Sequence, residues 1–137
     1  MHVKFKNLIE MVAKLRSEDG CPWDRKQTIA SMKKHMLEEA EELAEAIDND
    51  DTQHIEEELG DLLLNLLMIA QIAQEEKKFD IGSAMEKIAG KLISRHTWVF
   101  GTDEAATPEE AVELWYKNKA KEKESKGEKG SKQSGQA

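Results

Sequence analysis

Apolar residues recur at three- and four-residue spacing along most of the chain, which is the period of an amphipathic helix. The first predicted helix, residues 3–15, carries five apolar residues on one face: Phe5, Leu8, Ile9, Val12 and Leu15. Four more helices are predicted, over residues 28–49, 52–77 and 80–96, and from residue 108 onward. The longest strand-like run is only residues 98–100. The pattern therefore predicts an all-α fold, a bundle of about five helices.

Capping residues stand where these helices are expected to begin. Asp51 and Asp80 precede the third and fourth helices and can accept hydrogen bonds from free backbone N–H groups. Thr107 and Glu110 have the spacing of a capping box, and Pro108 occupies the first helical position, where its missing N–H is not needed. After residue 124 the chain is almost entirely Lys, Glu, Gly, Ser and Gln. Residues 1–124 are therefore predicted to form one domain, and residues 125–137 a disordered polar tail.

The composition and charge of the chain limit the kinds of partner and the compartment that we expect for it. The 137 residues carry a formal net charge of −8, and an acidic body repels nucleic-acid backbones, so broad DNA or RNA binding is not expected. No run approaches the roughly 18 apolar residues that a membrane span needs. The single cysteine, Cys21, excludes an intrachain disulfide, and the first residues lack the features of a signal peptide. These features predict a cytoplasmic protein.

The second and third predicted helices differ in character. Residues 28–49 form an amphipathic helix whose glutamates, taken alone, are typical of a solvated face. Residues 62–73 are apolar nearly all round, so this helix should be buried in a bundle or at an interface, and we expect a homo-oligomer, with a dimer favoured. Glu58 and Asp61 lie in line with these core positions, where a charge is costly unless it is paired or bound to a metal.

A short turn between these helices predicts that they pack antiparallel. Five carboxylates can then converge: Glu38, Glu39, Glu42, Glu58 and Asp61. Oxygen-only ligands suit a hard cation such as Mg²⁺, with Mn²⁺ as a substitute, and a cation would also mediate the approach of an anionic substrate. The four histidines lack the spacing of zinc ligands. The alternative is that Glu58 and Asp61 lie one turn too early to be buried, or pair with lysines.

Four segments resemble one protein family. Glu38-Glu39-Ala40-Glu41-Glu42 followed by Glu58-Leu59-Gly60-Asp61 resembles the E-E-x-x-E…E-x-x-D motif of MazG proteins, which belong to the all-α nucleoside triphosphate pyrophosphatase superfamily. The other matching segments, in the family's order, are residues 20–28, residues 91–101, and Trp115 with Lys119. The resemblance covers roughly residues 5–120. Three positions depart from the family pattern: Thr97 and Trp98 replace a proline and a histidine after the basic helix, and Ile29 replaces a histidine after Gln-Thr.

The resemblance implies a reaction, the hydrolysis of a nucleoside triphosphate to a monophosphate and pyrophosphate, and a role in house-cleaning of the nucleotide pool. Metal ions would be held by the five carboxylates, and Glu38 or Glu39 would accept the proton of the attacking water. Lys91 and Arg95, one turn apart, would grip phosphate oxygens. Trp115 and Lys119 would flank the nucleotide and its phosphates, although packing of Trp115 in the core is equally consistent with the pattern.

Trp23 is expected either to stack on a base or to anchor its own loop. Three rival interpretations stay open. The first is a non-catalytic helical interaction module with solvated acids. The second is a di-iron bundle, which needs paired Glu-x-x-His motifs, whereas the nearest approach here is a single Asp51-x-x-His54. The third is a pyrophosphohydrolase of the same superfamily that is dedicated to one substrate.

Overall fold

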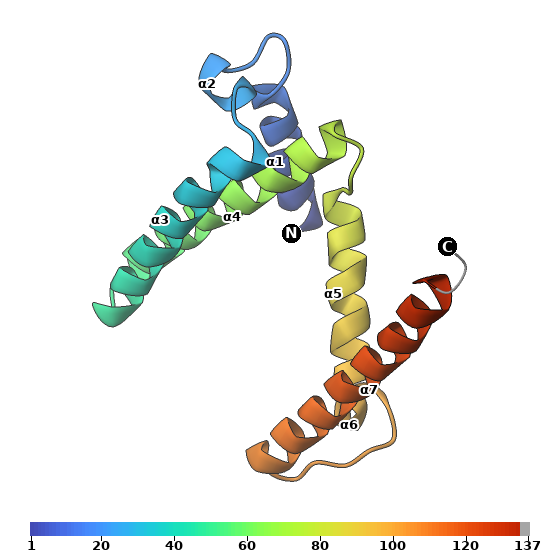
Figure 1. The fold of residues 1–137 in the computed structure, drawn as a ribbon. Coiled ribbons are helices and arrows are strands. Elements are labelled where there is room, and N and C mark those ends of the chain that lie inside the picture. Colours follow the sequence, from blue (N-terminus) through green and yellow to red (C-terminus); the bar gives the residue numbers. More distant parts are fainter. Residues whose placement is uncertain (135–137) are drawn as a thin grey trace. The chain divides into compact units, whose positions relative to one another are not determined.

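The computed structural model describes residues 1–134, and residues 135–137 lie outside the described part (Figure 1). Side chains are described through Gly127. In this part of the chain the order of elements is α1 (His2–Leu15), α2 (Pro22–Arg25), α3 (Ile29–Asp48), α4 (Thr52–Glu75), α5 (Ile81–Arg95), α6 (Thr97–Phe100) and α7 (Pro108–Ser134). The described residues contain no strand, so the all-α prediction is confirmed. The five long helices are the five that the pattern predicts, and α2 and α6 are single additional turns.

The chain divides into two compact units, residues 1–83 and the residues from Ala84 onward. In the first unit α3 and α4 form an antiparallel hairpin and lie side by side along their length (Figure 1). Thr28 and Ser31 cap the start of α3 reciprocally, and Asp51 Oδ1 accepts a hydrogen bond from the His54 N–H at the start of α4. The turn between the helices is completed by Asp50, whose φ of 51° lies in the left-handed region.

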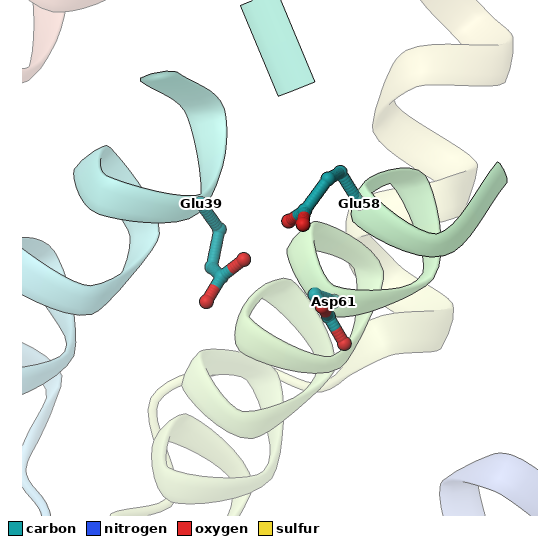
Figure 2. A group of neighbouring side chains, drawn as sticks. All are labelled: Glu39, Glu58 and Asp61. Atoms are coloured by element: carbon teal, nitrogen blue, oxygen red, sulfur yellow. The ribbon is translucent and has the colours of Figure 1, made fainter. Parts of the chain in front are cut away.

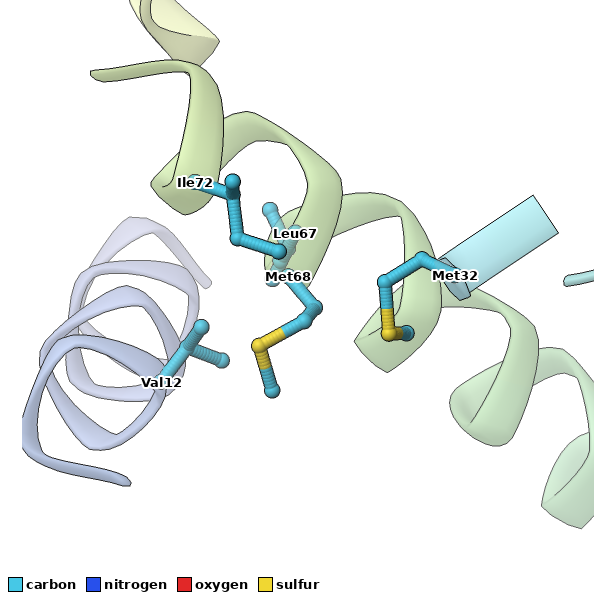
Figure 3. Close-up of a cluster of buried hydrophobic side chains, with 5 residues drawn as sticks. All are labelled: Val12, Met32, Leu67, Met68 and Ile72. Carbon is cyan, nitrogen blue, oxygen red and sulfur yellow. The ribbon is translucent and has the colours of Figure 1, made fainter. Parts of the chain in front are cut away.

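A small core joins α1 to this hairpin (Figure 3). Its buried residues come from three helices: Val12 from α1, Met32 from α3, and Leu67, Met68 and Ile72 from α4. The apolar face predicted for α1 packs against this cluster through Phe5, Leu8 and Ile9. All three α4 members lie in the second half of that helix. The first half of α4 therefore packs on α3 without cover from α1, and it is this half that carries the acidic motif.

The loop between α1 and α3 is fastened by Arg16. The Arg16 side chain is only 9% exposed, and its Nε lies 2.7 Å from Glu75 Oε2 at the end of α4. Its Nη1 donates to the carbonyl oxygens of Asp24 and Gln27. Gly20 allows the same loop to approach the end of α1, because a Cβ at this position would lie 2.2 Å from the carbonyl oxygen of Leu15. The Arg16 side chain thus positions the segment that contains α2, through one ion pair and two hydrogen bonds.

In the second unit α6 and α7 pack together. The buried Asn118 of α7 donates from Nδ2 to the carbonyl oxygen of Arg95 and to Thr97 Oγ1. The predicted start of α7 is confirmed at Pro108, and Thr107 Oγ1 accepts from the Glu110 N–H at 3.2 Å. The helix then continues to Ser134, past the expected domain end at Glu124. Within residues 1–134, no helix combines the length and the apolar composition needed to cross a membrane.

Candidate functional site

Three carboxylates from the α3–α4 hairpin converge (Figure 2). Glu39 lies on α3, and Glu58 and Asp61 lie on α4. Each offers one oxygen atom such that all three atoms lie within 4.8 Å of one another. Glu58 and Asp61 share a face because residues three apart are neighbours on a helix, and the antiparallel pairing brings Glu39 opposite them. The predicted convergence of the two acidic motifs is thus present for these three residues.

Two oxygens of this cluster are buried without a hydrogen-bond donor. Glu58 has a side chain that is only 8% exposed, and its Oε2 receives no hydrogen bond from any described residue. Glu39 Oε2 is in the same condition. A buried acceptor that is left without a partner costs about 1–3 kcal/mol, and more when it carries charge. The arrangement therefore favours binding of either a proton or a cation between the two helices.

The pKa of Glu39 reflects the same crowding of carboxylates. Burial raises the pKa of Glu39 from 4.5 to about 7, with further contributions from a proton shared with Glu58 and from the charges of Glu42, Asp61 and Glu58. The pKa of Glu42 is also raised, first through a proton shared with Glu58 and then through the charge of Glu58. Like charges held close together resist joint ionisation. In the absence of a cation, the site therefore holds protons at pH values where isolated glutamates have lost them.

The chemistry of the donor set fits a hard divalent cation. All three converging groups are carboxylates, and neither a cysteine nor a histidine belongs to the cluster. Mg²⁺ and Mn²⁺ prefer such oxygen ligands, whereas Zn²⁺ sites are usually built with His or Cys. A cation would satisfy both orphaned oxygens and remove the repulsion that raises the two pKa values. The described residues can thus hold a metal ion, and the cluster is the strongest candidate site in the first unit.

The remaining two predicted ligands, Glu38 and Glu42, are not among the three converging groups. Glu42 is exposed and lies next to Glu58, close enough for the two to share a proton. Glu38 is not one of the three converging residues, and its side chain is 51% exposed. Its oxygens lie 3.9 Å from Lys34 Nζ and 3.9 Å from His35 Nδ1. Glu38 therefore faces basic neighbours on its own helix, while Glu39 faces α4.

Trp23 stands on α2 with 48% of its surface exposed. Its ring makes an edge contact with His35, with the ring centroids 5.2 Å apart. The loop is anchored by Arg16, which donates to the carbonyl oxygens of Asp24 within α2 and of Gln27 just after it, and not by burial of this indole. The half-exposed ring of Trp23 is thus available to a ligand. It contacts His35, which lies about one turn of α3 before the acidic motif.

The basic and aromatic residues of the second unit form a separate group. The Arg95 guanidinium carbon lies 5.2 Å from the centre of the Trp115 ring, and Lys119 Nζ lies 5.1 Å from it. Two cations thus flank one indole, which is a cation–π arrangement. Lys91 lies one turn before Arg95 and is exposed. The structure places Lys119 beside Trp115, as their spacing predicts, and the packing of the helices adds Arg95.

Arg95 is also held by an acid that the pattern did not single out. Glu122 Oε2 accepts from Arg95 Nε at 3.0 Å, and Glu122 Oε1 accepts from the Ser94 hydroxyl. The Ser94 hydroxyl first, and Arg95 second, lower the pKa of Glu122. Glu122 follows Arg95 by 27 positions, and no helical period relates two residues on different helices.

Two further contacts in the first unit were missed from the sequence. His54 Nε2 lies 3.1 Å from Glu58 Oε1, although the histidines were interpreted as surface or packing residues. The i, i+4 spacing of this pair was a visible signal for it. Arg16 was not singled out from the sequence, and nothing local indicates that its partner is Glu75, 59 residues away.

Known proteins of similar sequence support a single family. The family model of the MazG nucleotide pyrophosphohydrolase domain matches residues 27–100. The chain is 43% identical over 121 residues to the nucleoside triphosphate pyrophosphohydrolase/pyrophosphatase MazG of Thermotoga maritima, covering 88% of this chain and 46% of that protein. It is 38% identical over 122 residues to the nucleoside triphosphate pyrophosphohydrolase of Escherichia coli K12, with the same coverage.

Two more relatives complete the comparison. The uncharacterized protein YabN of Bacillus subtilis is 40% identical over 123 residues, which are 90% of this chain and 25% of that protein. The chain therefore spans between a quarter and about half of the length of these curated relatives. The crystal structure of a mazG-related protein from Thermotoga maritima superposes with a TM-score of 0.71 at 34% identity, covering 84% of this chain and 98% of that one.

Proposed function

Because the chain belongs to the MazG nucleotide pyrophosphohydrolase family, we propose that it hydrolyses nucleoside triphosphates to monophosphate and pyrophosphate with Mg²⁺. The single observation that carries this proposal is the buried, donor-less oxygen pair of Glu39 and Glu58 beside Asp61. A purely structural acidic face would be solvated, and its carboxylates would have no reason to converge. This observation weighs against the non-catalytic helical module.

The metal would be held by Glu39, Glu58 and Asp61, with Glu42 at the rim of the cluster. When bound, a divalent cation supplies charge neutralisation at the phosphates and makes water a better nucleophile at neutral pH. Glu38 is the better of the two candidates for proton acceptor. A carboxylate engaged with a cation loses basicity, whereas Glu38 lies outside the converging group and is half exposed. In this proposal Glu38 takes the proton of the attacking water.

The substrate's phosphates would be gripped by Lys91, Arg95 and Lys119. Arg95 is held by Glu122 through Nε and by the face of Trp115, so its guanidinium is already oriented before substrate arrives. An oriented guanidinium loses little conformational entropy on binding and can engage phosphate oxygens in bidentate fashion. Trp115 would flank the nucleotide, and the exposed ring of Trp23 would stack on the base.

A homodimer is part of this proposal. Residues 59–66 of α4 leave three leucines on successive turns exposed, with Leu59 at 57%, Leu63 at 37% and Leu66 at 44%. On α3, Leu37 and Ile47 are 49% and 56% exposed. A second copy of the hairpin would cover such a surface and complete a four-helix arrangement. Light scattering on a sizing column should therefore give twice the chain mass at micromolar concentration, and a monomer there would contradict the dimer.

The test of the reaction is product identification with a panel of canonical and damaged nucleoside triphosphates. The parent should release pyrophosphate and a monophosphate when Mg²⁺ is present and stop when chelator is added. Glu58→Gln should lower turnover at least 100-fold. Changing a residue that only supports a metal ligand typically costs 10- to 100-fold, and the loss of a direct ligand should cost more. Glu57→Gln removes the same charge from the adjacent, exposed position and should leave turnover within about twofold.

The outcomes separate the alternatives. Release of orthophosphate with a diphosphate would contradict the proposed bond cleavage. Turnover of several damaged triphosphates supports house-cleaning of the nucleotide pool. Turnover of one substrate alone indicates the dedicated pyrophosphohydrolase. If no triphosphate of the panel is hydrolysed with Mg²⁺ or Mn²⁺, the result supports the non-catalytic helical module.

A further inference from the structure

His54 makes one close polar contact with the acidic cluster. Its Nε2 lies 3.1 Å from Glu58 Oε1, and its ring is 40% exposed while Glu58 is 8% exposed. An ionised carboxylate can only accept a hydrogen bond, so the contact requires a proton on Nε2. When Glu58 is ionised, as a metal ligand must be, His54 is thus a donor to the most deeply buried carboxylate of the cluster, and it stands one helical turn before that carboxylate.

The two oxygens of Glu58 consequently have different environments. Oε1 receives the imidazole N–H, and Oε2 is buried with no donor among the described residues. A carboxylate fixed through one oxygen cannot turn freely about its last torsion, so the other oxygen keeps its direction. The Glu58 carboxylate faces Glu39, and one oxygen each of Glu58, Glu39 and Asp61 lie within 4.8 Å of one another (Figure 2).

The backbone of His54 is itself fixed. Asp51 Oδ1 accepts from the His54 N–H at 3.2 Å as the cap of α4, which holds the first turn of the helix in place. A frayed helix start would let the imidazole drift, whereas a capped start keeps it over Glu58. Asp51, His54 and Glu58 therefore form a chain of contacts from the helix cap to the buried carboxylate.

An ordinary helix-surface pair would look different. The i, i+4 pair Lys6–Glu10 has both side chains more than 60% exposed and its charged atoms 3.9 Å apart. Such pairs stabilise a helix by only a few tenths of a kcal/mol, because water screens both partners. In the His54–Glu58 pair the acceptor is buried, and loss of the donor would leave a second buried oxygen without a partner.

We propose that His54 is a positioning residue that orients Glu58 Oε2 for the divalent cation by donating a hydrogen bond to Oε1. This inference rests on the metal site of the proposed function. Outer-shell partners of metal ligands typically change metal affinity by 10- to 100-fold when they are removed. His54 acts through Glu58 and does not itself contact the cation.

The experiment is an Mn²⁺ titration of the full chain, followed by electron paramagnetic resonance of the free ion, without substrate. His54→Phe keeps the ring volume and removes the donor. His54→Gln places an amide N–H near the position of Nε2 and keeps the donor. Gln53→Ala is the matched control, because it changes the exposed neighbouring residue in the same helical turn. Thermal melts of each variant in chelator check that the fold is retained, and His54→Ala replaces any His54→Phe protein that fails to fold.

We expect His54→Phe to weaken Mn²⁺ binding about 10-fold, and His54→Gln and Gln53→Ala to stay within about threefold of the parent. Parent-like affinity in His54→Phe would overturn the positioning role and leave the metal site standing. Equal loss in His54→Gln and His54→Phe would overturn it too, since the imidazole itself would then be needed. A parent that does not bind Mn²⁺ would remove both this inference and the metal site of the proposed function.

Discussion

The carboxylates of Glu39 on α3 and Glu58 on α4 face each other, and each buries one oxygen that no described donor reaches (Figure 2). Folding brings these two charges together, while the unfolded chain lets them separate and hydrate. The hairpin thus stores a local repulsion that a proton or a cation relieves.

The stability of the metal-free protein should fall as the pH rises from about 4.5 to about 7. Glu39 has a folded-state pKa of about 7 against 4.5 for the free side chain, so in this window the folded state binds more protons than the unfolded state. Excess protons in the folded state mean that stability decreases with rising pH. Melting temperatures in chelator should therefore be higher near pH 5.5 than at pH 8.

Glu39→Gln checks the origin of that slope. Glutamine cannot ionise, so the variant should lose most of the pH dependence and be more stable than the parent at pH 8 without metal. Glu45→Gln is the control, because Glu45 lies on the same helix outside the converging group. This variant should keep the parent's dependence of stability on pH. If Glu39→Gln and the parent have the same melting profile between pH 5 and pH 8, the repulsion at Glu39 is not the cause.

Asp61→Asn should separate function from stability. The substitution keeps the shape and removes one of the converging charges, so the metal-free protein should be as stable as the parent or more stable. Turnover should fall on the order of 100-fold or more. Added Mg²⁺ should also raise the melting temperature less than in the parent, because ligand stabilisation follows affinity for the folded state.

Paired melts in chelator and in Mg²⁺, alongside turnover, measure all three quantities for Asp61→Asn. A solvated Asp61 would change little in any of them. A variant that is destabilised without metal yet turns over normally would contradict the assignment of Asp61 to the metal site.

Arg16→Met should destabilise the protein by about 2–3 kcal/mol. The substitution removes the ion pair with Glu75 and leaves the carbonyl oxygens of Asp24 and Gln27 without their donor. Urea unfolding measures the loss, and Lys6→Met is the control, because the Lys6–Glu10 pair is exposed and long. Equal small effects of the two substitutions would show that Arg16 does not fasten the loop.

Truncation after Glu124 should leave turnover and melting temperature nearly unchanged. Residues 125–127 are exposed, and the residues beyond carry no apolar anchor that could dock on the domain. Although α7 extends to Ser134, a polar helix end without apolar residues adds little to the free energy of unfolding. A marked loss of either quantity in the truncated protein would reveal a contact made by this segment.

Local pattern was sufficient for the five long helices and for their ends up to the start of α7, whereas α7 continues to Ser134, past the expected domain end at Glu124. The apolar period of 3.6 predicted α1, α3, α4, α5 and α7, and short-range capping rules predicted the roles of Asp51 and Pro108. The same period placed Glu58 and Asp61 on one face of α4. These features depend on residues three or four positions apart, whose geometry the helix itself dictates.

The partners across helices were decided only by tertiary structure. The sequence offered five carboxylates as equals, and the packing of α3 on α4 turned Glu39 toward Glu58 and left Glu38 beside Lys34 and His35. The rotation of a helix about its own axis depends on how side chains interlock at the contact, and no repeat in one helix records it.

The partners in long-range ion pairs were also decided only by tertiary structure. Arg16 meets Glu75 across 59 positions and Arg95 meets Glu122 across 27, and neither partner can be chosen from the many acids of the chain by spacing. The sequence by itself therefore determined which segments are helical and which chemistry the acidic motifs can perform. Only the folded chain decided which oxygen atoms meet, because that depends on distances between segments that have no fixed relation until they pack.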